Sequence, residues 1–180
     1  MMILLLSCTS MYGQRYSVST DILGWADLAT INAELSYAPA RHFTLNLQGQ
    51  YNNWNFGSVE KGNPFQDRVR GVAFGGRYWP WNVYSGLWMG AGLRAEEYNY
   101  GGFFRKMRTE EGRAVGGGLS FGYSLMLRSN LNIDFGVGLW AGRKDFTVYA
   151  CPRCGRIVEQ GKGFFVLPSS DTQISFVYIF

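Results

Sequence analysis

The chain has 180 residues, enough for one domain, and is rich in aromatic residues (17%) and in glycine (24 residues). Its mean hydropathy is only -0.10, and it contains no run of about 18 apolar residues, which excludes a membrane-spanning helix. The net charge of +4 comes from basic residues scattered over expected loops, which argues against nucleic acid as a partner.

The amino terminus resembles a secretory signal peptide that lacks its basic start. A short apolar run from Ile3 to Leu6 is followed by small residues and a candidate cleavage position after Gly13. We therefore predict a truncated signal peptide over residues 1–13 and a barrel domain over residues 14–180. Cys8 follows a Leu-Leu-Ser stretch that loosely matches a lipoprotein box, so lipidation of Cys8 is the alternative.

Turn signals divide the rest of the chain into eight expected strands. Short turns lie at residues 38–41, 80–82 and 128–130, where Pro and Asn suit tight turns. Longer polar connections lie near residues 24–30, 56–66, 99–112 and 146–165. Short connections at one end and long ones at the other are typical of bacterial outer-membrane barrels. The expected strands lie near residues 15–23, 31–38, 42–55, 67–79, 84–98, 113–127, 131–145 and 166–180.

Large apolar residues alternate with small or polar ones along these strands. Over residues 131–145, for example, Leu131 and Ile133 share one face, and Asn132 and Asp134 share the other. A soluble barrel such as a lipocalin would alternate in the same way, with its apolar face inward. Here the apolar face is nearly free of charge and the opposite face is small or polar, which favours lipid on the outside. The sequence therefore predicts an all-β, eight-stranded antiparallel transmembrane up-and-down β-barrel in a Gram-negative outer membrane, with its long loops extracellular.

Several charged residues fall on the inward face of the expected barrel. An eight-stranded barrel is only wide enough for side chains to fill, so these charges must pair or meet water. We expect the two arginines of this set to form a network with Glu34, Glu96 and Asp134. A polar plug is the favoured interpretation, and a proton or ion path is the alternative. The full set is Asp21, Glu34, Arg77, Arg94, Glu96 and Asp134.

The sharpest local motif is Cys-Pro-Arg-Cys-Gly at residues 151–155. The favoured interpretation is a disulfide between Cys151 and Cys154 that stiffens the last surface loop. A zinc site needs four ligands, and only Cys8 and His42 remain in the chain to complete one. Thioredoxin-like redox chemistry needs a helix start beside a βαβ unit, which the pattern lacks.

No catalytic, cofactor-binding or metal-binding constellation emerges from the sequence, so we expect a non-enzymatic protein without cofactor. The only histidine, His42, lies beside a short turn rather than at the expected outer rim. A lipid-modifying outer-membrane enzyme and a narrow pore remain the alternatives. Residues 103–108 combine aromatic and basic side chains that could touch lipopolysaccharide phosphates. Trp54, Trp79 and Trp81 lie near strand ends, where interfacial aromatic girdles occur.

The last strand carries an expected assembly signal. Counting back from the terminus, Phe180, Tyr178 and Phe176 put a large aromatic side chain at every second position. A terminal aromatic strand of this kind is the signal that we expect the barrel-assembly machinery to bind. The strand must also pair with the first one, because an open sheet edge is not tolerated in lipid.

The Cys151–Cys154 motif, Gly163-Phe164-Phe165, Pro168 and the terminal strand together resemble a family of small Gram-negative outer-membrane β-barrels classed as a domain of unknown function. Residues 16–23, 51–56 and 77–79 are also similar to that family. Members commonly carry Gly-Pro-Thr-Lys before the final strand, whereas this chain has Leu-Pro-Ser-Ser at residues 167–170.

The resemblance implies the barrel fold and the outer-membrane location. Some members are associated with fimbrial gene clusters, which implies a structural, adhesive or fimbria-associated surface role. The expected partners are outer-membrane lipid and lipopolysaccharide, the barrel-assembly machinery, and fimbrial or other surface proteins.

Overall fold

The computed structural model describes residues 15–26, 30–56, 65–101, 108–151, 155–168 and 172–180. The predicted signal peptide and Cys8 therefore lie outside the described residues. The elements are β1 (Tyr16–Asp21), α1 (Ile22–Ala26), β2 (Ile31–Ala40), β3 (Phe43–Phe56), β4 (Phe65–Tyr78), β5 (Gly86–Gly101), β6 (Thr109–Arg128), β7 (Leu131–Tyr149), β8 (Ile157–Pro168) and β9 (Gln173–Ile179). Within the described ranges, no helix has the length and apolarity needed to cross a membrane.

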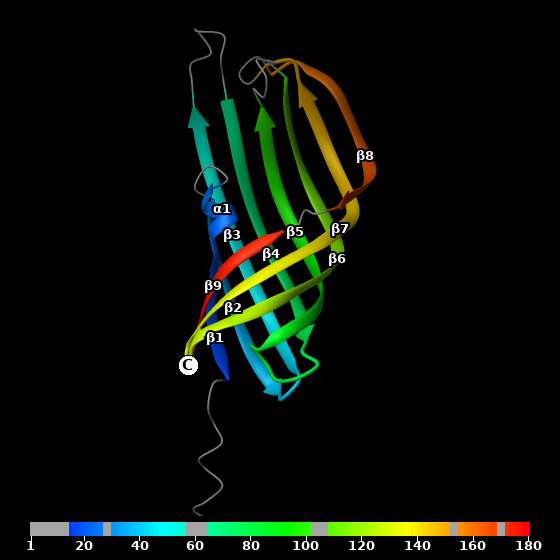
Figure 1. The fold of residues 1–180 in the computed structure, drawn as a ribbon. Coiled ribbons are helices and arrows are strands. Elements are labelled where there is room, and N and C mark those ends of the chain that lie inside the picture. Colours follow the sequence, from blue (N-terminus) through cyan, green and yellow to red (C-terminus); the bar gives the residue numbers. More distant parts are fainter. Residues whose placement is uncertain (1–14, 27–29, 57–64, 102–107, 152–154, 169–171) are drawn as a thin grey trace, which may run out of the picture.

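Eight of the strands close into an antiparallel barrel (Figure 1). Each of β1 to β7 pairs with the next strand, and β9 closes the ring by pairing with β7 on one side and β1 on the other. β8 pairs with the far part of β7, from Leu139 to Tyr149, and extends the wall beyond β9. The predicted all-β, eight-stranded antiparallel barrel is confirmed.

The register of the ladders fixes the tilt of the strands. A row of directly paired residues starts at Asn132 of β7, passes once around the barrel, and returns to β7 at Gly142, which is a stagger of ten residues. With eight strands, this stagger corresponds to a strand tilt of about 40°. The row runs through Asn132, Val177, Ser19, Glu34, Gln48, Ala73, Arg94, Gly116 and Gly142.

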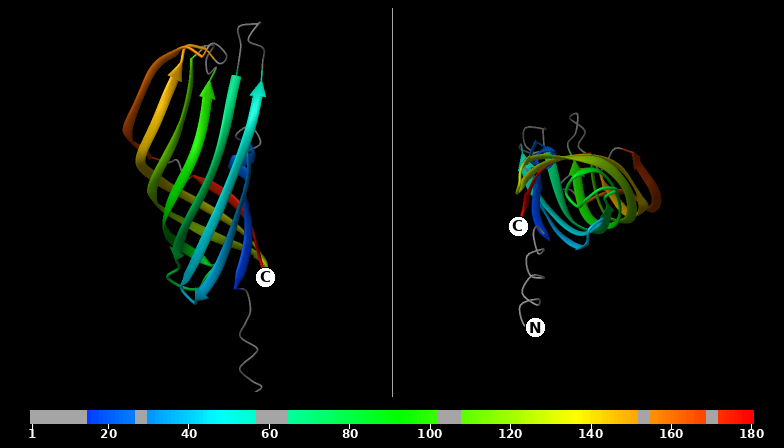
Figure 2. Two further views of the ribbon diagram at one scale, coloured as in Figure 1. Left: turned by 180° about the vertical axis from the view of Figure 1, so that it is seen from behind. Right: turned by 60° about the horizontal axis from the view of Figure 1, so that its bottom comes forward.

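Four sequence-based boundaries are wrong. Of the expected connections, residues 99–101, 109–112, 146–149 and 157–165 are strand, because β5, β6, β7 and β8 extend far past one end of the barrel (Figure 2). The expected last strand, residues 166–180, is split into β8 and β9. Pro168 has no N–H to donate to the ladder, and the register along β7 shifts between the Leu139–Pro168 and Gly136–Gln173 pairs. The first expected strand stops at Asp21, where α1 begins.

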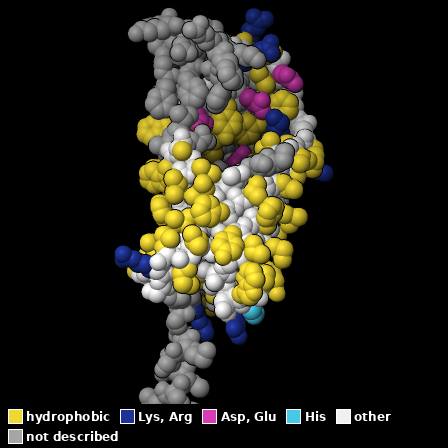
Figure 3. All heavy atoms as spheres, viewed as in Figure 1, with side chains coloured by type: hydrophobic (Ala, Val, Ile, Leu, Met, Phe, Trp, Pro, Cys, Tyr) yellow, Lys and Arg dark blue, Asp and Glu magenta, His cyan; other side chains and the backbone are white. Residues whose placement is uncertain are grey.

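The two faces of the wall differ as the alternation predicts. Large apolar side chains point outward and are exposed, among them Leu93 (69%), Leu119 (62%) and Phe121 (62%). Apolar side chains spread over the outer surface in Figure 3; we call the outward apolar residues of the strands the apolar belt. Asn132, Asp134 and Thr44 point inward and are almost fully buried. Near the chain termini, Tyr16 stacks on Tyr37 with 5.1 Å between ring centroids, which adds an aromatic edge to the belt.

Candidate functional site

An aromatic plug fills the end of the barrel at which Tyr16 and Phe180 lie. Trp79 follows β4, Tyr84 precedes β5, and Trp88 lies on the inward face of β5. The side chains of Trp79 and Trp88 are 0% and 1% exposed. They pack with Val177 and Ile179 of β9. The Trp88 ring packs over Gly122 of β6 and its paired residue Gly136 of β7, and a Cβ on either glycine would overlap it. The plug therefore closes this end of the lumen.

Trp79 corrects a sequence-based assignment. It was expected beside Trp54 and Trp81 in an interfacial girdle, and those two are indeed exposed (41% and 55%). Trp79 instead continues the inward parity of β4 two residues after Arg77, and its Nε1 donates to the Thr44 hydroxyl at 3.2 Å. His42, next to the same turn, contacts the Trp79 carbonyl through Nδ1 at 3.0 Å.

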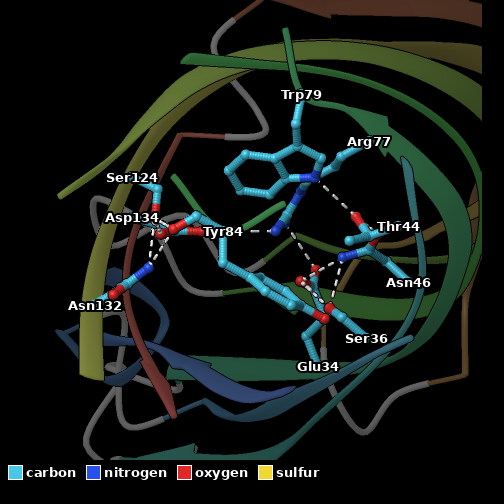
Figure 4. Close-up of polar contacts among 10 residues, drawn as sticks. All are labelled: Glu34, Ser36, Thr44, Asn46, Arg77, Trp79, Tyr84, Ser124, Asn132 and Asp134. Atoms are coloured by element: carbon cyan, nitrogen blue, oxygen red, sulfur yellow. Dashed lines mark hydrogen bonds and ion pairs between the residues drawn. The ribbon is translucent and has the colours of Figure 1, made fainter. Parts of the chain in front are cut away.

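An ion-pair layer lies directly above the plug (Figure 4). Arg77 of β4 lies 2.9 Å from Glu34 of β2 and 3.8 Å from Asp134 of β7, so one guanidinium bridges opposite walls. Its Cζ also lies 4.5 Å from the ring centroid of Trp88. All three charged side chains are at most 13% exposed.

Neutral side chains complete the hydrogen bonds of this layer. Asn46 donates to Glu34 at 2.8 Å, and Ser124 donates to Asp134. Asn132 donates to the Ser124 hydroxyl at 3.0 Å and to the Tyr84 carbonyl at 2.6 Å. A buried charge is costly unless it is paired and hydrogen-bonded, and these contacts meet that requirement.

The other predicted lumen charges make contacts outside this layer. Asp21 accepts from the backbone N–H groups of Leu23 and Gly24 at the start of α1, and from that of Ile174 at 3.0 Å. Arg94 lies over the ring of Trp140, with 5.2 Å between Cζ and the ring centroid. Glu96 accepts from Gln50 at 3.4 Å. Asp21 thus fastens the start of β9 to the end of β1, while Arg94 and Glu96 belong to the space above the ion-pair layer.

A polar cavity of about 150 Å³ occupies that space. Its lining carries two acids and two arginines together with amide side chains and one indole. Two residues of the lining, Trp140 and Gln173, each carry a buried donor, Nε1 and Nε2, that has no hydrogen-bond partner. The principal side chains of the lining are Asp21, Glu34, Asn46, Gln48, Gln50, Arg77, Arg94, Trp140 and Gln173.

A second aromatic cluster lies above the cavity, built from Val69, Tyr98, Ala114 and Trp140. Beside it, Glu110 accepts from Lys144 and from the Tyr98 hydroxyl, each at 2.8 Å. Burial raises the pKa of Glu110, but these two hydrogen bonds outweigh burial and hold the pKa below its usual value. Glu110 is therefore anionic at neutral pH, and its pair with Lys144 is an ion pair.

A row of alternating charges crosses the outer face above the apolar belt. Register places its five members side by side on β4 to β8, and we call them the charged row. Arg113 lies 2.8 Å from Glu97, and Lys162 lies 3.1 Å from Asp145. The row consists of Arg70, Glu97, Arg113, Asp145 and Lys162, and it separates the belt from a polar outer surface that includes Glu111 and Gln160.

The remaining predicted site residues are the two cysteines, the basic segment of residues 103–108 and the aromatic residues of the last strand. Cys151 is disulfide-bonded, whereas its predicted partner Cys154 and residues 103–107 lie outside the described residues. Phe176, Tyr178 and Phe180 point outward on the last strand and are 46–59% exposed. Among the described residues, no three His, Cys, Asp or Glu side chains gather where they could hold a metal ion.

Sequence reasoning missed the roles of Trp88 and Trp140. Both share the inward parity of the small residues around them, but alternation alone gives no reason for a large ring on that face. The signal that could have found Trp88 is the pair of inward glycines, Gly122 and Gly136, which leave room for its indole.

The molecule is thus a small antiparallel β-barrel with an apolar outer belt and a plugged, ion-paired interior. The chain belongs to the family described as protein of unknown function (DUF3575), whose model matches residues 1–180. Comparison with curated proteins gives no match.

Proposed function

We propose that the protein is a non-enzymatic barrel of the Gram-negative outer membrane with a structural, adhesive or fimbria-associated role at the cell surface. The apolar belt carries this proposal. On β6 the belt runs from Val115 to Leu127, and twelve residues at a tilt of about 40° span about 30 Å, enough to cover the apolar band of outer-membrane barrels, which is about 25 Å tall.

The connections at the two ends of the barrel support a particular orientation in the proposed membrane. The short turns near residues 41–42 and 129–130 lie at the same end as the carboxyl terminus, and short turns of outer-membrane barrels face the periplasm. At the opposite end the strands continue past the charged row, and this extended part of the wall has a polar outer face. In the proposed orientation this wall faces the outside of the cell, where it would contact lipopolysaccharide or surface proteins.

A charge placed in the belt tests the membrane location. Leu119→Arg is expected to lower the free energy of unfolding in lipid vesicles by about 2–4 kcal/mol, because Leu119 lies near the middle of the belt. Gln160→Arg, beyond the charged row on the outer face of β8, is the matched control and should change it by less than about 0.5 kcal/mol. Urea titration followed by tryptophan fluorescence measures both. Equal effects of the two substitutions would point to water around the belt and contradict the proposal.

A deletion strain tests the surface role. Loss of the protein is expected to reduce adhesion or fimbrial display, or to make the envelope leak, with lipid A acylation unchanged. Altered lipid A acylation would instead favour the lipid-modifying enzyme. The Trp79–Trp88 plug supports a closed barrel over a narrow pore, and steady single-channel conductance of the purified protein in planar bilayers would contradict it.

A further inference from the structure

Within the described residues, the barrel wall has a lateral opening above β1, β2 and β9. β1 ends at Asp21 and β2 begins at Ile31. By contrast, β3 on one side and β7 with β8 on the other continue farther away from the end at which Phe180 lies. Within the described residues, β8 pairs only with β7, and residues 52–56 of β3 pair only with β4. No described strand therefore fills the wall between β8 and β3 at this level, and Figure 3 shows a hollow there with acidic and apolar side chains inside.

The rims of the opening are apolar. Leu167 pairs in register with the inward Trp140, so it lies on the inner face of β8, and yet it is 46% exposed. Its neighbour Val166 lies on the outer face and is 55% exposed. On the side of the short strands, Trp25 of α1 and Ile31 of β2 are 50% and 56% exposed. The opening is thus bordered by side chains continuous with the apolar belt.

The polar cavity lies directly behind this opening. Asp21 and Gln173, at the ends of the short strands, belong to its lining together with Arg94 and Trp140. The lining balances Asp21 and Glu34 against Arg77 and Arg94, so its formal charge is zero. Its two unpartnered groups, Trp140 Nε1 and Gln173 Nε2, are both donors, and a buried donor without a partner is costly. The cavity therefore favours a group rich in acceptor oxygens.

We propose that the opening and the cavity form a binding site for an amphipathic lipid. The polar head group enters the cavity, where its oxygens accept from Trp140 and Gln173, and the acyl chains remain outside against Val166, Leu167 and Ile31. This inference rests on the proposed membrane location and adds a ligand to it. Phosphate and sugar hydroxyls offer the same acceptor chemistry, so the experiment must tell a phospholipid from a glycolipid.

Calorimetric titration of the refolded barrel in amphipol tests the site with two probes, dihexanoylphosphatidylglycerol and octyl glucoside. One of the two is expected to bind saturably at one site per barrel. Trp140→Phe keeps an aromatic ring but removes the N–H donor, and it should weaken binding about fivefold, as expected for one neutral hydrogen bond. Ala73→Leu, on the inward face of β4, should abolish binding by filling the cavity.

Ala95→Leu, on the outward face of β5, is the matched control for Ala73→Leu and should bind like the wild type. A heat-dependent shift in gel migration checks that every variant is folded. Absence of saturable binding by either probe would overturn the site, as would unchanged affinity in both Trp140→Phe and Ala73→Leu. Such a failure is distinct from failure of the membrane proposal, which the Leu119→Arg and Gln160→Arg pair tests without any ligand.

Discussion

Gly122→Ala is expected to lower the free energy of unfolding by about 1–3 kcal/mol, the usual cost of overpacking a filled interior. A Cβ on Gly122 would overlap the Trp88 ring and the Phe135 carbonyl oxygen. The backbone atom cannot yield without distorting the ladder between β6 and β7, and the indole is packed over both strands. Urea unfolding in lipid vesicles, followed by tryptophan fluorescence, measures the loss.

Gly117→Ala is the matched control on the same strand. Gly117 points outward, and the nearest atom to an added Cβ, the carbonyl oxygen of Gly92, is 3.4 Å away, an ordinary contact. Alanine there should leave stability unchanged or slightly raise it, because it reduces the conformational freedom of the unfolded chain. If both substitutions cost the same, the Trp88 slot does not constrain the barrel.

Alternation was sufficient to predict which face most strand residues occupy. Phe176, Tyr178 and Phe180 point outward, and Asp134 points inward, because a strand with one apolar face has only one register compatible with that face. The same pattern could not locate the break at Pro168 or the long extensions of β5 to β8. Polar residues continue the strands there, and the backbone ladder extends beyond the end of the alternating hydrophobic pattern.

The partners of the lumen charges depend on the relative register of all eight strands. Arg77 reaches both Glu34 and Asp134 because the ten-residue stagger brings β2 and β7 to the height of its guanidinium. No single strand encodes that stagger, so inward parity alone cannot choose between Arg77 and Arg94 as the bridging residue. Asp21 shows a different limit: its carboxylate accepts from the backbone of the turn that follows it, a local contact that strand parity does not reveal.

Arg77→Met is expected to have the largest effect of any substitution proposed, lowering the free energy of unfolding by about 3–5 kcal/mol. Methionine preserves much of the side-chain volume but removes the charge shared by Glu34 and Asp134, and both carboxylates are then left buried without a cation. The triple variant Arg77→Met, Glu34→Gln, Asp134→Asn should regain much of this loss, because the buried charges disappear together. Urea unfolding in vesicles gives all the values.

Arg113→Met is the control, since Arg113 makes an equally short ion pair, 2.8 Å from Glu97, on the outer face. Its side chain is 79% exposed, so water replaces the lost contact and the expected cost is about 0–1 kcal/mol. The contrast between the two arginines also bears on what fills the barrel. In a water-filled pore, solvent would screen Arg77 as it screens Arg113, and both substitutions would be mild. A large loss at Arg77, recovered in the triple variant, would instead require a dry, packed interior and so favour the plug over the conduit.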